Sequence, residues 1–271
     1  MAMSRRNSTI AASIADRAEA CRADVLSALS ALADGGIEPE RVHAVRIGLR
    51  RLQAYFELVG DARRAALMAQ CVSRLSRLRT LHVFEAYLKR RNAPTADRRA
   101  VRKRLKKNAA KLLQRETFRK LERRVRREGA LPHGVTDATI SEHLQQNRLA
   151  QAEALEERLE QALARPSRKA LHALRLLIKT ARYQEEWASD DQRRPALLDR
   201  LKRAQTILGR YEERAEFRKL TDRLELRAAK RIRKDWRRAR RQARVVPQEL
   251  HRILDQLIHE PRHASIVQLR R

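Results

Sequence analysis

Two segments of the chain place a histidine and several cations along one side of a helix. The first runs from His43 to Tyr55 and reads HAVRIGLRRLQAY, and the second runs from His172 to Gln184 and reads HALRLLIKTARYQ. In an α-helix, positions three, seven and ten residues after the histidine lie within about 80° of it. The first row is therefore His43, Arg46, Arg50 and Gln53, and the second row is His172, Arg175, Lys179 and Arg182. Two matched rows predict one anion-binding site built from two related halves.

The two rows border apolar residues instead of lying opposite them. Val45 and Leu49 flank the first row, and Leu174 and Ile178 flank the second. A row at the edge of a core is expected to point into a groove or an interface. Two cations about 7 Å apart repel by roughly 2 kcal/mol at an effective dielectric of 20, so a gathered cluster favours a bound polyanion. The alternative is a solvated charged face, and the repetition of the pattern argues against it.

The histidine that starts each row has two interpretations. Each could be a satisfied core or interface residue. Because both His43 and His172 stand at the same place in the pattern, a role in contacting ligand or positioning the helix is favoured. A protonated imidazole adds charge and donors, so binding is expected to strengthen at mildly acidic pH.

The composition points to a helical protein with a polyanionic partner. Lys plus Arg number 63 against 33 Asp plus Glu, and the formal net charge is +30. That excess indicates nucleic acid, polyphosphate or an acidic membrane surface. Only 7 Gly and 7 Pro occur, and 42% of residues are hydrophobic, which is typical of helices. With no signal-peptide or membrane-spanning pattern and two isolated cysteines, Cys21 and Cys71, a cytoplasmic protein is expected.

Breaks in the helical pattern divide the chain into two halves. Residues 4–129 are predicted to hold four helices and residues 137–259 four more, with the best linker between them. The expected helices cover residues 8–33, 39–59, 63–91 and 96–128, and then 138–164, 168–189, 196–245 with an interruption near Gly209, and a short helix from Pro247 to 259. Each row falls on the second helix of its half. This shared order predicts an all-α fold of two four-helix bundles related by pseudo-two-fold symmetry.

These residues resemble the CHAD family, the conserved histidine α-helical domain, whose pattern is similar to His-x-x-Arg-(Val/Ile)-x-x-(Arg/Lys)-(Arg/Lys)-Leu-Arg in each half. The matching positions are His43, Arg46, Arg50 and Arg51 in the first half and His172, Arg175, Lys179, Arg182 and Tyr183 in the second. The resemblance covers almost the whole chain and treats residues 1–271 as a single CHAD domain. It implies two four-helix bundles with a basic central cleft or pore that binds inorganic polyphosphate. No Glu-x-Glu-x-Lys motif is present, so the chain resembles a stand-alone member without a CYTH domain.

The chain departs from the family pattern at several positions. Arg79 matches a family arginine on the next helix, but Thr80 replaces the acid that usually follows it. Gln53 and Thr180 stand where the family often has a further cation. In the second half, Leu208-Gly209 is followed by Glu213 where an aspartate is usual. The lost cations predict weaker binding, and the lost acid predicts a change in how the row is held.

The expected helix over residues 96–128 is densely basic all around, so most of its cations must be solvated. Lys103 and Lys107 are the candidates from this helix to extend the anion track, and Lys202, Arg203 and Arg210 are candidates from the second half. The predicted polyphosphate-binding set is His43, Arg46, Arg50, Arg51, Arg79, Lys103, Lys107, His172, Arg175, Lys179, Arg182 and Lys202.

These residues could serve three different functions. The leading hypothesis is a non-enzymatic protein that binds inorganic polyphosphate, with a place at polyphosphate granules. The alternative is a non-specific nucleic-acid-binding protein held by the net charge, although aromatics are only 4% of the chain and base stacking usually needs more. The third is an enzyme that uses His43 or His172. No carboxylate cluster for Mg²⁺ and no phosphate-binding loop accompanies either histidine, so no catalytic residue, cofactor or metal is predicted.

Overall fold

The chain forms helices and connecting turns, with no strand among the residues that are described. The structure is a computed structural model and describes residues 10–35, 37–128, 135–188 and 194–259. The helices are α1 (Ile10–Gly35), α2 (Pro39–Leu58), α3 (Ala62–Arg90), α4 (Thr95–Leu112), α5 (Arg115–Glu128), α6 (Asp137–Ala164), α7 (Arg168–Trp187), α8 (Pro195–Arg223) and α9 (Ala229–His259). The all-α prediction is confirmed, while the pairing into two symmetric bundles stays a prediction.

Short-range signals set the ends of the helices that carry the two rows. Pro39 lies in the first turn of α2, where its missing N–H is not needed. The Ser167 hydroxyl accepts a hydrogen bond of 3.2 Å from the Ala170 N–H and caps α7. Gly48 lets α1 approach α2 closely, because a Cβ there would lie 2.2 Å from the Val25 Cγ2. Both row-bearing helices therefore begin where the sequence predicts.

The prediction of one helix over residues 96–128 was wrong. The chain turns at Leu113–Gln114 and divides this segment into α4 and α5. Val101 of α4 is buried beside the ends of α3 and α8, whereas Phe118 and Leu121 of α5 are buried in a different core. Because one straight helix cannot bury both sets, packing imposes the turn.

The break predicted near Gly209 was also misplaced. Helix α8 continues through Gly209, and the chain breaks only after Arg223. Glu225 adopts a positive φ of 50° in that turn. Pro247 lies inside α9 instead of starting a new helix. Val246 and Leu250 on either side of it are both buried, so packing keeps the helix continuous across the proline.

Three hydrophobic cores hold the helices together. The first core lies among α1, α2, α3 and α5, and it also includes Leu112 at the end of α4, Ile140 and Leu144 of α6, and Tyr183 and Trp187 of α7. The second core joins α6, α7, α8 and α9. The third core joins the end of α3 to α4, α8 and α9 through stacked Phe84 and Phe217, whose ring centroids are 4.6 Å apart. The two halves of the chain are therefore connected by buried apolar contacts at two separate places.

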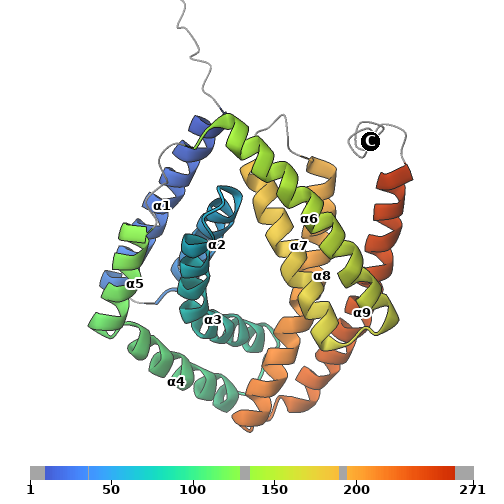
Figure 1. The fold of residues 1–271 in the computed structure, drawn as a ribbon. Helices are drawn as coiled ribbons and strands as arrows, with labels where there is room; N and C mark the ends of the chain where they lie inside the picture. Colours follow the sequence, from blue (N-terminus) through green and yellow to red (C-terminus); the bar gives the residue numbers. More distant parts are fainter. Residues whose placement is uncertain (1–9, 36, 129–134, 189–193, 260–271) are drawn as a thin grey trace, which may run out of the picture.

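Helices α2 and α7 meet at their C-terminal ends. The Trp187 indole N–H donates to the Arg51 carbonyl at 2.8 Å, and the Tyr55 and Trp187 rings pack edge to face at 5.6 Å. From this contact the two helices separate toward their N-terminal ends, with α3 and α8 beyond them (Figure 1). The two rows thus lie on helices that form two arms of a V.

Candidate functional site

The first row points toward α3 and α7. Arg46 is half-buried and donates through Nη1 to the Ser76 hydroxyl at 2.7 Å. Burial, and then the charges of Arg50 and Arg79, lowers the pKa of Arg46 to about 10. Burial also lowers the pKa of Arg50, whose buried Nε has no hydrogen-bond partner among the described residues. The charged forms of Arg46 and Arg50 are therefore disfavoured by burial and by neighbouring cations.

Lys179 of the second row lies among cations from both helices. Its pKa is lowered to about 6, first by burial and then by the charges of Arg50, Arg175, Arg46 and Arg182. Two of these four belong to α2 and two to α7. Charges from both α2 and α7 therefore act on the same side chain, and a shared anion-binding site built from the two rows stays a prediction. We call this group of five residues the central cluster.

Arg175 and Arg182 of the second row are held differently. The Nε of Arg175 is buried without a hydrogen-bond partner in the described part of the chain, and Gly209 packs beside it, where a Cβ would lie 3.7 Å from that atom. Arg182 donates to the Gln205 Oε1 at 2.9 Å, is paired with Glu186, and stacks 4.2 Å above the Tyr183 ring centroid. Arg175 thus keeps donor capacity for a ligand, while Arg182 is already partly neutralised.

The histidines lie at the wider end of the V. Partial burial, and then the charges of Arg79 and Arg46, lowers the pKa of His43. The Nδ1 of His172 is 3.5 Å from the Glu212 carboxylate, which also binds Arg168. His43 therefore faces cations and His172 faces an acid, so the two histidines are not equivalent.

Arg79 extends the cluster onto α3. Burial lowers its pKa, while the charges of Glu213 and Glu40 act in the opposite direction. Glu213, which follows the Leu208-Gly209 pair, therefore faces Arg79 across the two halves. Thr80, in place of the usual family acid, donates to the Ser76 carbonyl at 3.0 Å within its own helix.

Not every predicted site residue is brought to the central cluster. Arg51 is half-exposed, with its Nε 3.8 Å from the Glu186 carboxylate. Lys103 and Lys107 are exposed on α4, and no contact between them and the cluster is described. Lys202 is exposed on α8, one turn before Gln205 and on the side that faces α7. The role of all four in binding stays a prediction.

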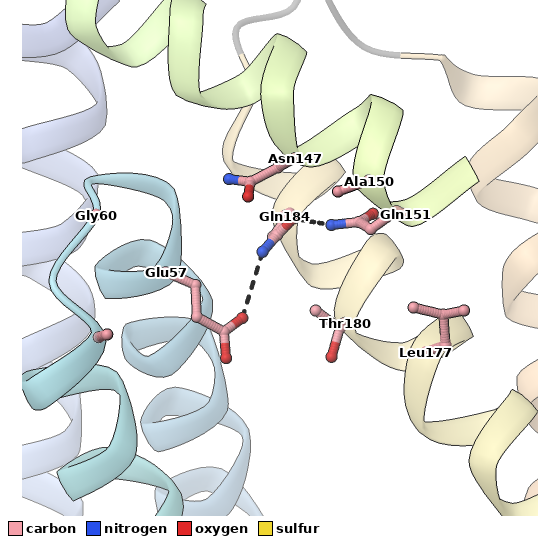
Figure 2. A pocket seen from close by; sticks show the side chains of 9 residues that line it. Glu57, Gly60, Asn147, Ala150, Gln151, Leu177, Thr180 and Gln184 are labelled. Carbon is pink, nitrogen blue, oxygen red and sulfur yellow. Dashed lines mark hydrogen bonds between the residues drawn. The ribbon is translucent and has the colours of Figure 1, made fainter. Parts of the chain in front are cut away.

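An amide-rich pocket lies beside the contact between α2 and α7. Its volume is about 370 Å³, and Glu57, Asn147, Gln151, Thr180 and Gln184 are among its lining residues. Figure 2 shows the Glu57 carboxylate accepting from Gln184, at 3.3 Å, and Gln184 in contact with Gln151. Gln53 of the first row also donates to Glu57, at 2.9 Å. Gln53, placed where the family often has a cation, therefore serves to hold an acid next to Arg50.

Sequence reasoning identified Lys202, Gly209 and Glu213 of α8, but it missed Gln205 and Glu212. Gln205, Gly209 and Glu212 contact Arg182, Arg175 and His172, and they are four and three residues apart on one face of α8. That spacing was visible in the sequence, but only packing shows that this face meets the second row. No group of three or more His, Cys, Asp or Glu residues that could hold a metal ion occurs within the described ranges.

Comparisons with known proteins identify the family and support the fold. The CHAD domain family matches residues 16–222. The chain belongs to the CHAD domain family. The fold is similar to the crystal structure of the CHAD domain from the plant Ricinus communis, with a TM-score of 0.60 and 19% sequence identity, covering 90% of this chain and 89% of that one. A comparison with curated proteins found no match.

The CHAD match spans both rows, which lie on α2 and α7. At 19% identity, the plant structure supports the fold alone. In addition, none of the helices in the described part of this CHAD chain is long and apolar enough to cross a membrane.

Proposed function

We propose that this CHAD chain binds inorganic polyphosphate at the central cluster. The observation that carries the proposal is Lys179, whose pKa falls to about 6 because it is buried among Arg46, Arg50, Arg175 and Arg182. Burying cations together is costly even with Glu57 and Glu186 at the edge of the group, and a polyanion placed there reduces the cost. Cations gathered in this way are expected to bind phosphate oxygens strongly. The association of CHAD domains with polyphosphate supports the same ligand.

Two guanidinium groups supply the donors. The Nε atoms of Arg50 and Arg175 are buried and lack partners among the described residues. Buried donors are almost always hydrogen-bonded, so unpaired ones indicate atoms that a ligand satisfies. Guanidinium groups bind phosphate oxygens through two N–H bonds at once. In the proposed cleft, successive phosphates bind to Arg46 and Arg50 of α2 and to Arg175 of α7. Arg79 extends this binding surface along α3.

Aromatic packing favours polyphosphate over nucleic acid. Trp187 is 5% exposed and packs in the first core, and the guanidinium groups of Arg218 and Arg240 lie over the Trp236 ring. Tyr183 is buried beneath Arg182. Single-stranded nucleic acids usually need aromatic faces on which bases stack. We propose weak nucleic-acid binding by net charge alone, and a place at cytoplasmic polyphosphate granules.

A binding role, not catalysis, fits the family, because CHAD is a helical binding domain. His43 stands beside Arg79 and Arg46, and His172 beside Glu212. The proposal assigns both histidines to the wide end of the site as ligand contacts or positioning residues.

The test is a double substitution, Arg46→Ala with Arg175→Ala, which removes one cation from each row. Loss of a hydrogen bond to a charged group costs about 1.5–3 kcal/mol, so each change should weaken polyphosphate binding by roughly tenfold to a hundredfold. Arg119→Ala with Arg123→Ala, an exposed pair on α5, removes the same charge elsewhere and should change affinity far less. Circular dichroism checks helicity. Retained tight binding in a folded double variant would contradict the proposal.

Competition separates the two ligands. If the proposal holds, polyphosphate displaces labelled single-stranded DNA at a much lower phosphate concentration than DNA displaces polyphosphate. Equal competition per phosphate would favour the nucleic-acid alternative.

A further inference from the structure

A second basic pocket lies away from the central cluster, at the turn between α3 and α4. Its volume is about 580 Å³. Asn92, Ala93 and Pro94 form one side, and the start of α9 forms the other. The cationic residues that line it are Arg227, Lys230, Arg231, Lys234 and Arg237, and no acidic residue lines it. We call this cavity the outer basic pocket.

The acids nearest to the outer basic pocket are already engaged elsewhere. Asp97 is 3% exposed, and its carboxylate accepts from the backbone N–H groups of Arg227 at 3.1 Å and Ala228 at 2.8 Å. Asp235 accepts from the Tyr87 hydroxyl at 2.7 Å and pairs with Arg91, also at 2.7 Å. The lining cations are therefore not neutralised by the acids beside them.

The lining cations remain available to an incoming anion. All five are exposed. Arg231 donates to the Arg91 carbonyl, which orients its guanidinium against the α3–α4 turn. For the other four, no ion pair is described within the part of the chain that the structure covers. Lys230, Lys234 and Arg237 recur at helical spacing and form one charged side of α9.

The outer basic pocket is separate from the central cluster. Arg79 and Asn92 lie at the two ends of a helical segment about 20 Å long, at 1.5 Å per residue. The third core, with Phe84, Tyr87 and Phe217, lies between them. A short anion therefore cannot contact both places at once.

We propose that the outer basic pocket is a second binding site for linear polyphosphate. Its position is independent of the proposed function, but the choice of ligand rests on it. Five cations gathered in one shallow pocket match the charge density of an unadorned phosphate chain. No aromatic residue lines the pocket to stack a base. With two sites, one protein holds two segments of polymer, and a long chain links several proteins.

The test reverses two charges in the outer basic pocket, Lys230→Glu with Lys234→Glu. Folding should be preserved, since both side chains are exposed and an acid in the first turn of a helix is favourable. The matched control is Arg119→Glu with Arg123→Glu, which has the same spacing and charge change on exposed positions of α5. Isothermal titration with tripolyphosphate measures the number of chains bound, and light scattering with long polyphosphate measures cross-linking.

The expected result is one fewer tripolyphosphate bound per protein, and a loss of scattering, in the outer-pocket variant but not in the control. Equal behaviour of the two variants overturns the proposal. Preferential displacement of this second ligand by single-stranded DNA at equal phosphate also overturns it. The Arg46→Ala, Arg175→Ala protein distinguishes the two proposals: if it keeps the full stoichiometry while the outer-pocket variant loses one ligand, the central site fails and the outer site stands.

Discussion

At the scale of single residues, Lys179 shows how burial and neighbouring cations act together in the central cluster. Its pKa of about 6, against an ordinary value of 10.5, arises from burial and from the four neighbouring arginines. At neutral pH the amine of the empty protein is mostly neutral. A polyphosphate nearby restores the charged form, because its negative charge offsets the surrounding cations. Binding is therefore coupled to proton uptake.

The first prediction follows from this coupling. Polyphosphate affinity should fall as pH rises above about 6, because a proton must then be taken from solution for Lys179. His43, whose pKa is lowered, adds to the same trend below its ordinary value of 6.5. Titration calorimetry in buffers of different ionisation enthalpy measures the protons taken up. Lys179→Met should remove most of the uptake near neutral pH, and unchanged uptake would show that another group carries it.

The second prediction concerns the stability of the empty protein. Because the folded pKa of Lys179 is depressed, the unfolded state binds more protons between about pH 6 and 10.5, so this residue makes stability rise with pH across that window. Lys179→Met keeps the buried aliphatic length and removes the titration. Urea unfolding at several pH values should show a more stable and less pH-dependent variant near neutral pH. A less stable variant would mean that Lys179 is favourably paired.

The third prediction concerns Glu57, an acid beside the cationic site (Figure 2). It accepts from Gln53 and Gln184, and its negative charge acts on Arg50. Glu57→Gln keeps the shape and removes that charge, so polyphosphate should bind more tightly, by about fivefold to thirtyfold if roughly 1–2 kcal/mol of repulsion is relieved. Glu122→Gln on α5, where Glu122 pairs with Arg126 away from the cluster, is the control for net charge. Weaker binding after Glu57→Gln would show that Glu57 organises the site.

At the scale of helices, two carboxylates, one buried and one partly buried, join the starts of distant elements. Asp97 at the start of α4 binds the backbone N–H groups of Arg227 and Ala228 just before α9. Asp137 at the start of α6 binds the N–H groups of Ile10 and Ala11 in the same manner. Unpaired N–H groups at a helix start carry partial positive charge, which explains why an acid is placed at each.

The fourth prediction tests this link. Asp97→Ala removes two charge-assisted hydrogen bonds from a buried position and should destabilise the protein by about 3 kcal/mol. Asp222→Ala is the control, because Asp222 is half-exposed and forms only a surface pair with Arg233, worth about 0–1 kcal/mol. Chemical denaturation measures both. Equal effects would show that the link between α4 and α9 adds no stability.

At the scale of the whole molecule, the net charge of +30 opposes the compact state and favours a polyanion. The three cores and the linking carboxylates hold the chain against this repulsion. A ligand that neutralises the cations should stabilise the folded protein as well as bind it.

The fifth prediction is the salt dependence of this interaction. If the central cluster neutralises about five phosphate charges, log affinity should fall against log salt with a slope of roughly −3.5, using the single-strand coefficient. A polyphosphate short enough to occupy one site should be used in the Lys230→Glu, Lys234→Glu background. A slope near zero would show that the cations of the two rows do not contact phosphate.

The sequence by itself determined the helical fold and the two rows, because the period of an α-helix converts residue spacing into a shared face. The same spacing predicted an anionic ligand, since His43, Arg46 and Arg50 share one face, as do His172, Arg175 and Lys179. The start of α2 at Pro39 and the start of α7 directly after Ser167 could be predicted, because helix starts depend on neighbouring residues in the sequence.

Tertiary structure alone decided which faces meet. The turn at Leu113–Gln114 and the continuity of α9 through Pro247 depend on cores assembled from distant segments. The placement of Lys179 among arginines from both helices, the packing of Gly209 beside Arg175, and the outer basic pocket join residues far apart in the chain. Local spacing fixes the face of the helix on which a side chain lies. Burial of that side chain, and repulsion between cations of different helices, arise only when packing brings two faces together.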